Sequence, residues 1–254
     1  MKSRNKMIKK NTGYFITAPK QDFFNQYREN MIIEVVQALA KSEAGSQIAF
    51  KGGTALRLFY DLPRFSEDVD YDFLSGMSAD KLLNIIKNVF KKKKWEITDA
   101  AIKYHTVLLE LRFPGPERNF HVKIEVSTRE KELDTTILSL RGVAILALEP
   151  SFLMTEKLLT FIERQAGRDI FDAWFILKNG YPLKEAMIIN ACGDELRFYQ
   201  IVLDKIKAAN PKKIYRDTGK LLGHDYRNWM KTSFLDDFKR LVVNKIDTFK
   251  MANR

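Results

Sequence analysis

The stretch that decides the fold reads Phe50-Lys51-Gly52-Gly53-Thr54 and, after eleven further residues, Ser66-Glu67-Asp68-Val69-Asp70-Tyr71-Asp72. Successive side chains of a strand point to opposite faces, so the three aspartates of the second segment are expected on one face. Carboxylates gathered in this way repel one another unless a cation lies among them. A Gly-Gly turn leaves backbone N–H groups open to a bulky anion. The two segments therefore predict a phosphate site beside a divalent-metal site.

The composition describes an ordinary globular chain with a basic balance. It has 254 residues, enough to bury a real core in one or two domains. A hydrophobic content of 45% and a charged content of 30% exclude a disordered chain. The 43 basic and 32 acidic residues give a net charge of +11, which favours a polyanionic partner.

Cysteine usage and hydropathy point to the cytoplasm. The single Cys192 excludes an internal disulfide and fits a reducing compartment. One cysteine and three histidines leave no zinc cluster. The sequence has no run of apolar residues long enough for a transmembrane helix, and its basic start lacks the apolar segment of a secretory signal. We therefore expect a cytoplasmic protein without a membrane partner.

Hydrophobic periodicity divides the first part of the chain into alternating helices and strands. Apolar residues recur at helical spacing over 22–41 and predict an amphipathic helix. The apolar segment 48–50 predicts a strand, and a short helix is expected over 54–60 with Thr54 near its N-cap. Further expected elements are a helix over 78–90 and strands over 95–98, 106–113, 120–126 and 143–148.

Pro150 marks a change in pattern. Downstream of it the spacing is almost wholly helical, with expected helices over 151–165, 168–178, 182–208 and 233–249. The sequence therefore predicts two domains, a sheet-containing one over 1–149 and a helical one over 150–254.

Apolar and polar residues alternate strictly over 120–126, and this pattern indicates a third candidate carboxylate. Its apolar residues occupy one face, which places Glu125 on the polar face. If this strand lies beside the aspartate strand, Glu125 can join the cluster of Asp68 and Asp70.

Three groups of residues resemble those of the AbiEii/AbiGii-type nucleotidyltransferases. The first is the stretch quoted above with Leu62-Pro63-Arg64-Phe65 leading into it, and the second is Lys123-Ile124-Glu125-Val126. The third runs from Leu148-Glu149-Pro150 through Met154-Thr155-Glu156-Lys157-Leu158-Leu159 to Gly167-Arg168-Asp169-Ile170-Phe171-Asp172. The resemblance covers about residues 45–180. Such proteins are toxins of type IV toxin–antitoxin and abortive-infection systems, within the polymerase-β-like superfamily.

The resemblance implies the fold and the reaction. The expected fold is α/β (α+β): a polymerase-β-like nucleotidyltransferase lobe with a mixed sheet, followed by a helical C-terminal lobe, with the nucleoside triphosphate (NTP) between them. In the implied reaction a hydroxyl attacks the α-phosphate of the NTP and pyrophosphate leaves. Two Mg²⁺ (or Mn²⁺) ions can clamp the attacking and leaving oxygens, which requires bridging carboxylates.

Metal binding is expected from three carboxylates. Asp68 and Asp70 are the expected ligands, and Glu125 is the candidate for the second metal or for accepting the proton. All three are therefore catalytic candidates. Asp72 is a spare.

Nucleotide binding is expected from the Gly-Gly turn and its surroundings, namely Gly52, Gly53, Thr54 and Ser66. By resemblance, Gly53 and Thr54 cradle the triphosphate through backbone N–H groups and a hydroxyl. Lys157 is expected both to act in catalysis and to bind the β- or γ-phosphate as a point charge.

The helix expected over 168–178 carries two further candidates. Its (i, i+3) spacing puts Asp169 and Asp172 on one face. The resemblance implies an active aspartate in this helix and leaves the choice open. We prefer Asp172 as the catalytic residue and place Asp169 with the nucleotide.

Simpler explanations exist for several of these residues. Strand alternation alone predicts a polar residue at Glu125, and Lys157 fits an exposed helix lysine. Arg57 and Arg64 can serve only as electrostatic support for the carboxylates. The joint occurrence of the Gly-Gly turn and the Asp-x-Asp pair at this spacing is what favours a functional site.

Charge and aromatic residues concentrate at the C-terminal end. Residues 211–254 hold eleven Lys/Arg and five Asp, so +6 of the net +11 lies there. Tyr215, Tyr226 and Trp229 are interleaved with these charges, as in many RNA-binding surfaces. Plain surface helices explain the pattern equally well.

The resulting hypothesis is a metal-dependent nucleotidyltransferase that moves a nucleotide from an NTP to an acceptor hydroxyl. The resemblance implies a toxin that acts on RNA, with the 3′ end of tRNA as one candidate, and a cognate antitoxin. Transfer to a protein hydroxyl is the first alternative. A non-catalytic binding module of the same fold is the second, and the intact Asp68/Asp70 pair speaks against it. A protein of this fold without toxicity is the third.

Overall fold

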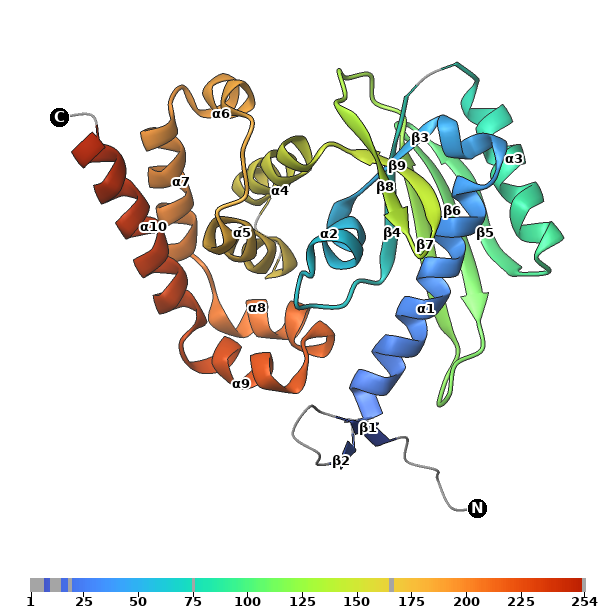
Figure 1. Ribbon diagram of the computed structural model, residues 1–254, viewed down its shortest axis with the longest axis horizontal. Coiled ribbons are helices and arrows are strands. Elements are labelled where there is room, and N and C mark those ends of the chain that lie inside the picture. Colours follow the sequence, from blue (N-terminus) through green and yellow to red (C-terminus); the bar gives the residue numbers. More distant parts are fainter. Residues whose placement is uncertain (1–6, 10–14, 18–19, 75, 165–166, 253–254) are drawn as a thin grey trace.

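The chain is built on a seven-stranded mixed sheet in the order β5-β6-β7-β4-β3-β9-β8. The computed structural model describes residues 7–9, 15–17, 20–74, 76–164 and 167–252, and Figure 1 shows their arrangement. Only β4/β7 and β3/β9 pair in parallel, and the other neighbours are antiparallel. The prediction of an α/β fold with a mixed sheet is confirmed.

The strands have the following bounds: β3 Ile48–Lys51, β4 Asp68–Phe73, β5 Glu96–Lys103, β6 Thr106–Phe113, β7 Phe120–Ser127, β8 Thr135–Leu140 and β9 Val143–Leu148. In a separate two-stranded sheet, β1 Met7–Lys9 pairs antiparallel with β2 Phe15–Thr17. The strands β1, β2 and β8 were not predicted. For β8 the reason is visible in its alternation of exposed and half-buried residues, which leaves it without a fully buried face at the edge of the sheet.

Helices α1 (Lys20–Ala40) and α3 (Ala79–Lys92) lie along one side of the sheet, and the short helix η1 (Glu43–Ser46) follows α1 (Figure 1). Helix α2 (Gly52–Tyr60) lies between the sheet and the later helices. Ser78 caps α3, because its hydroxyl accepts a hydrogen bond from the Lys81 N–H. The expected helices over 22–41 and 78–90 are therefore confirmed.

The chain leaves the sheet at Pro150, the first residue of α4. The helices that follow are α4 Pro150–Glu163, α5 Gly167–Asn179, α6 Glu185–Cys192, α7 Glu195–Lys207, α8 Pro211–Thr218, η2 Gly219–Leu221, α9 His224–Thr232 and α10 Phe234–Ala252. None of the helices described is long and apolar enough to cross a membrane. A single cluster of buried apolar residues continues from the sheet into these helices.

Two local predictions were wrong, and two helices were missed. The helix expected over 182–208 is two helices, because Gly193 adopts φ +94° and Asp194 caps the start of α7. Helices α8 and α9 had not been predicted. Thr54 is not an N-cap, since α2 begins at Gly52 with Lys51 in the cap position.

Strand pairing brings together residues that are far apart in the sequence. The parallel pair β4/β7 places Asp70 directly opposite Glu125, and the antiparallel pair β3/β4 places Lys51 opposite Asp70. The condition under which Glu125 was expected to join the aspartates is therefore met. On the other face of β4, Val69 and Tyr71 are buried in the core.

A buried ion pair connects the loop before β4 to the helices after Pro150. Arg64 Nε and Nη2 donate to the two carboxylate oxygens of Asp172 on α5, each at 2.6 Å. Both side chains are almost fully buried. Burial alone would raise the pKa of Asp172, but the charges of Arg64 and Lys157 outweigh it and hold that pKa below its ordinary value. The pair is thus charged and bidentate, the strong form of this interaction.

Replacing Asp172 by alanine is expected to lower the free energy of unfolding by about 3–5 kcal/mol, because Arg64 then remains buried without its counter-charge. Urea denaturation of the purified variant measures the change. The matched control is Asp204→Ala, which removes an exposed helix partner of Lys207. That change is expected to cost less than about 1 kcal/mol. Equal losses in the two variants would contradict the assignment.

Candidate active site

A cleft of about 720 Å³ opens between the sheet and helices α4 and α5. Its floor is formed by the ends of β3 and β4 and by the polar side chains of β7. Eight basic and six acidic side chains line it: Lys51, Arg64, Lys123, Arg129, Lys131, Lys157, Arg164 and Arg168, with Asp68, Asp70, Glu125, Glu156, Glu163 and Asp169. A cleft that mixes many cations with a local group of carboxylates suits a ligand with both phosphates and a metal.

The two glycines of the turn are required by close contacts on either side. Gly52 has φ +80°, and a Cβ there would lie 2.3 Å from the Asp70 carboxylate oxygen Oδ2. At Gly53 a Cβ would lie 2.4 Å from Nη2 of Arg64. Both glycines line the cleft at the start of α2, whose first N–H groups receive no side-chain cap from Lys51. A helix N-terminus in this state attracts anions.

Of the two hydroxyl residues expected at the nucleotide, Ser66 lies at the cleft and Thr54 does not. Thr54 is buried, and its hydroxyl donates to the backbone carbonyl of Asp68, which ties α2 to the start of β4. The structure thus places the Thr54 hydroxyl behind the aspartate strand rather than at the cleft surface.

Asp68, Asp70 and Glu125 gather on one side of the cleft. Burial raises the pKa of Asp70 to about 6, and the neighbouring charges of Asp68 and Glu125 add to the rise, while Lys157 and Lys51 oppose it. Arg168 reaches Asp68 at 3.5 Å, and Lys123 pairs with Glu125 at 2.6 Å. Among the described residues no hydrogen bond or ion pair is made by the Asp70 carboxylate. Asp70 is therefore the member of the cluster that has no direct partner among the described residues.

The chemistry of these donors fits Mg²⁺ or Mn²⁺, which prefer carboxylate oxygens. The half-buried Asp70, which has no hydrogen-bond or ion-pair partner among the described residues, is the observation that favours a cation here. Within the part of the chain that the structure describes, no group of three or more His, Cys, Asp or Glu side chains is placed to hold a metal ion together. Glu125 in particular is held by Lys123, so the pair Asp68 and Asp70 is the better-prepared part of the site.

Asp72 is separated from this cluster by two lysines. It is only 1% exposed and forms ion pairs with Lys51 and Lys131, each at 2.8 Å. Both lysines also pair with Glu156 of α4. Asp72 thus anchors a lysine-rich wall of the cleft.

Lys157 and the two aspartates of α5 form one network. Lys157 Nζ lies 3.1 Å from Asp172 and 3.6 Å from Asp169. Asp169 lines the cleft, whereas Asp172 is fully buried beneath Arg64 and Lys157. The structure therefore brings Lys157 and Asp169 to the cleft and places Asp172 as the residue that holds Arg64 and Lys157 in position.

Several cleft residues were not selected from the sequence, namely Lys51, Arg129, Lys131, Glu156 and Arg168. Lys51 and Glu156 directly adjoin selected residues, which was the available signal. Lys131 lies in the irregular segment after β7, where periodicity predicts nothing. Of the two suggested supporting arginines, Arg64 holds Asp172, while Arg57 pairs with Glu29 of α1 at 2.6 Å, away from the cleft lining.

The comparison with family models supports this interpretation of the cleft. The model described as "Nucleotidyl transferase AbiEii toxin, Type IV TA system" matches residues 34–244, which is most of the chain. None of the curated proteins is similar enough to match.

Two solved structures share the fold. One is a protein from H. pylori assigned as a nucleotidyltransferase, with a TM-score of 0.56 and 20% identity, covering 89% of this chain and 97% of its own. The other is JHP933 from Helicobacter pylori, with a TM-score of 0.53 and 18% identity, covering 93% of this chain and 100% of its own. At these identities the similarity concerns the fold, and it confirms the expected nucleotidyltransferase fold.

Replacing Gly52 by alanine is expected to abolish NTP binding, because the added Cβ displaces the Asp70 carboxylate. Gly142→Ala is a matched control, since Gly142 has φ +82° and nothing within 4 Å of its Cβ position. Both variants are expected to lose about 1–2 kcal/mol of stability from the left-handed backbone. Calorimetric titration with NTP separates them, and a loss of binding in both would contradict the specific role of Gly52.

Asp70→Asn is expected to become the more stable protein as pH rises. The folded pKa of Asp70, about 6, exceeds its ordinary 3.8, so its contribution to stability is present below pH 3.8 and is lost as pH rises through 6. The ionised carboxylate then costs roughly 3 kcal/mol in the absence of metal. Urea denaturation in a chelator at about pH 4 and about pH 8 measures the difference between the two proteins. The exposed Asp99→Asn should show no such difference.

Proposed function

Since the chain belongs to the AbiEii family of type IV toxin nucleotidyl transferases, and is itself a nucleotidyltransferase, we propose that its cleft moves a nucleotide from an NTP to an acceptor hydroxyl with Mg²⁺ or Mn²⁺ as cofactor. The observation that carries the proposal is the half-buried Asp70, which has no hydrogen-bond or ion-pair partner among the described residues and lies beside Asp68 and Glu125 at the uncapped start of α2. A triphosphate with its metal supplies both missing partners.

The cofactor would be held by Asp68 and Asp70. Glu125 joins them when its carboxylate is released from Lys123. When bound, the metal would polarise the α-phosphate and stabilise the charge that develops on the leaving pyrophosphate. A carboxylate at position 125 can also accept the proton of the attacking hydroxyl, since it is more exposed than Asp70 and lies on the neighbouring strand.

The triphosphate is proposed to lie along the basic wall of the cleft. Backbone N–H groups at Gly53 and the start of α2 bind one phosphate, with Gly52 and Ser66 beside them. Lys157 neutralises the β- or γ-phosphate, and Asp169 lies next to it at the nucleotide. Asp172 acts through Arg64 and Lys157 and does not touch the substrate. Thr54 acts through the backbone of Asp68.

The acceptor is proposed to be RNA, for which the 3′ end of tRNA is one candidate. The net charge of +11 and the basic C-terminal region support a polyanionic acceptor. A cognate antitoxin, a cytoplasmic location and a division into domains 1–149 and 150–254 are further parts of the proposal. Transfer to a protein hydroxyl is the second candidate, supported by the same catalytic residues.

Incubation of the purified protein with α-³²P-labelled NTPs and a cell lysate tests the proposal. We expect label in the RNA fraction, and we expect Asp70→Asn to lower its incorporation by at least about 10²-fold. Even indirect partners of a metal ligand cost 10–100-fold when they are removed.

Asp99→Asn, an exposed change on β5, serves as the control and should keep full activity. Label in protein instead of RNA would favour the second candidate. Undiminished labelling by Asp70→Asn would contradict the catalytic role of the cluster.

A further inference from the structure

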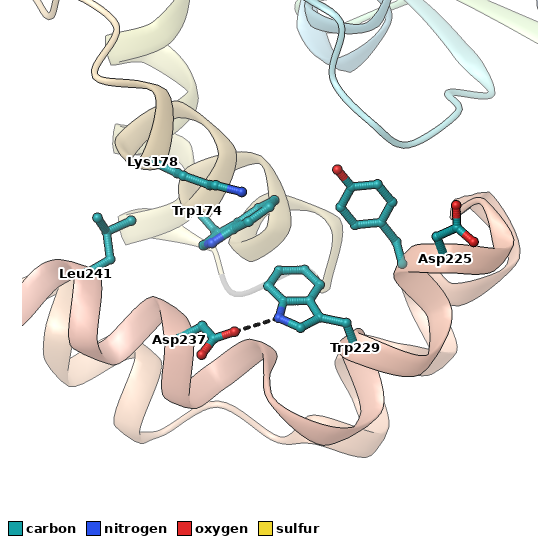
Figure 2. A pocket seen from close by; sticks show the side chains of 7 residues that line it. Trp174, Lys178, Asp225, Trp229, Asp237 and Leu241 are labelled. Atoms are coloured by element: carbon teal, nitrogen blue, oxygen red, sulfur yellow. Dashed lines mark hydrogen bonds between the residues drawn. The ribbon is translucent and has the colours of Figure 1, made fainter. Parts of the chain in front are cut away.

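A second cavity, of about 650 Å³, lies in the helical region between α5, α9 and α10. The rings of Trp174, Tyr226 and Trp229 line it, and Figure 2 shows the two tryptophans. Lys178, Asp225, Asp237 and Leu241 complete the lining. Trp174 is only 4% exposed and backs the cavity, whereas Tyr226 and Trp229 are partly exposed. The reaction proposed above uses none of them.

The walls are held in fixed orientations. The Trp229 indole N–H donates to Asp237 at 2.6 Å, and Arg240 donates to the other oxygen of the same carboxylate. Trp174 packs against Trp229 with 4.6 Å between ring centres. Tyr226 meets Trp229 edge to face, with 6.0 Å between centres and 78° between planes. The rings thus form a rigid corner that needs no rearrangement to receive a flat molecule.

The cavity already accommodates one stacked group. Lys178 Nζ lies 4.7 Å from the centre of the Trp174 ring, an arrangement that occupies one aromatic face. Tyr226 and Trp229 are only partly buried, and both line the cavity.

The polar groups of the cavity indicate which kind of aromatic ligand would bind there. Asp225 and Asp237 are carboxylates, which accept hydrogen bonds and repel phosphate. Exposed cations lie on two of the helices that form the cavity, Lys231 on α9 and Lys239 and Arg240 on α10, and on the preceding segments Lys212 and Lys220 are exposed as well. A ligand that matches this pattern has an aromatic ring with N–H donors at its edge and negative charge outside the ring. An unpaired nucleotide of an RNA strand has both.

The cavity is connected to the active site through a short stretch of backbone. Phe65 N–H donates to the Leu221 carbonyl at 2.8 Å, and Arg64 forms a bridge with Leu222. Lys220 pairs with Glu67, the neighbour of Asp68, at 3.0 Å. Helix α9, which carries Tyr226 and Trp229, starts immediately after this contact.

We propose that the cavity formed by Trp174, Tyr226 and Trp229 binds an unpaired nucleobase of the acceptor RNA, a few nucleotides from the reacting hydroxyl. The inference rests on the proposed function, because it assumes an RNA acceptor. It assigns the aromatic residues of the basic C-terminal region to base stacking and its lysines and arginines to the phosphates.

Tryptophan fluorescence tests the proposal directly, since only Trp95, Trp174 and Trp229 occur in the chain. In full-length Trp95→Phe protein, without NTP, a short unpaired RNA oligonucleotide is expected to quench the emission. An abasic oligonucleotide of the same length has the same phosphates and is expected not to quench it. Because no NTP is present, the result is independent of whether transfer occurs.

Tyr226→Ala is expected to weaken RNA binding about 5- to 150-fold, the equivalent of the 1–3 kcal/mol attributed to one stacked base. Tyr226→Phe keeps the ring and should bind normally. In the transfer assay the KM for RNA should rise while the KM for NTP stays unchanged.

Asp225→Asn is expected to leave the fold intact, since this side chain is 85% exposed. Loss of an acceptor at the cavity is expected to weaken binding of the RNA. Tighter binding by this variant would mean that a phosphate occupies the cavity and would overturn the proposal. Equal quenching by the abasic oligonucleotide, or no quenching by RNA, as for a cavity that holds a protein partner, would overturn it as well.

Discussion

The active-site cleft depends on the ion pair between Arg64 and Asp172. The guanidinium lies directly under Gly53, close enough that no larger residue fits there, and its counter-charge comes from α5, more than a hundred positions later in the chain. The same carboxylate holds Lys157 of α4. One buried carboxylate therefore fixes the relative positions of the Gly52-Gly53 turn, Lys157 and the helix that carries Asp169 and Arg168. An aspartate that never reaches the substrate can be indispensable in this way.

The aspartate strand β4 carries a carboxylate whose ionisation destabilises the folded chain. Asp72 is buried but neutralised by two lysines, and Asp68 is exposed enough for water and Arg168 to solvate it. Asp70 has no ion-pair partner among the described residues. Its raised pKa shows that desolvation destabilises the ionised carboxylate. Proteins retain such groups where a ligand completes them. Asp70 and Asp72, two residues apart on one face, thus differ in that only Asp72 has ion-pair partners.

Much of the fold followed from the sequence, because its signals are local. Alternation in 120–126 correctly placed Glu125 on the polar face, and helical spacing located α1, α3, α4 and α5. The misses have physical causes: β8 lacks a buried face, and Gly193 with Asp194 interrupts a pattern that otherwise continues through 182–208. In the site, the sequence pointed to Asp68, Asp70 and Lys157 as part of one cleft. It could not show that Thr54 and Asp172 are buried, since that depends on contacts with Asp68 and Arg64 that only the folded chain brings together.

The most direct test of the central claim is whether a metal ion relieves the destabilisation at Asp70. The thermal unfolding midpoint of the wild-type protein should be measured at neutral pH with and without Mn²⁺ and NTP, beside that of Asp70→Asn. If a metal ion binds at Asp70, the ligands raise the unfolding midpoint of the wild-type protein and leave that of the variant unchanged. Equal increases in both proteins would contradict metal binding there.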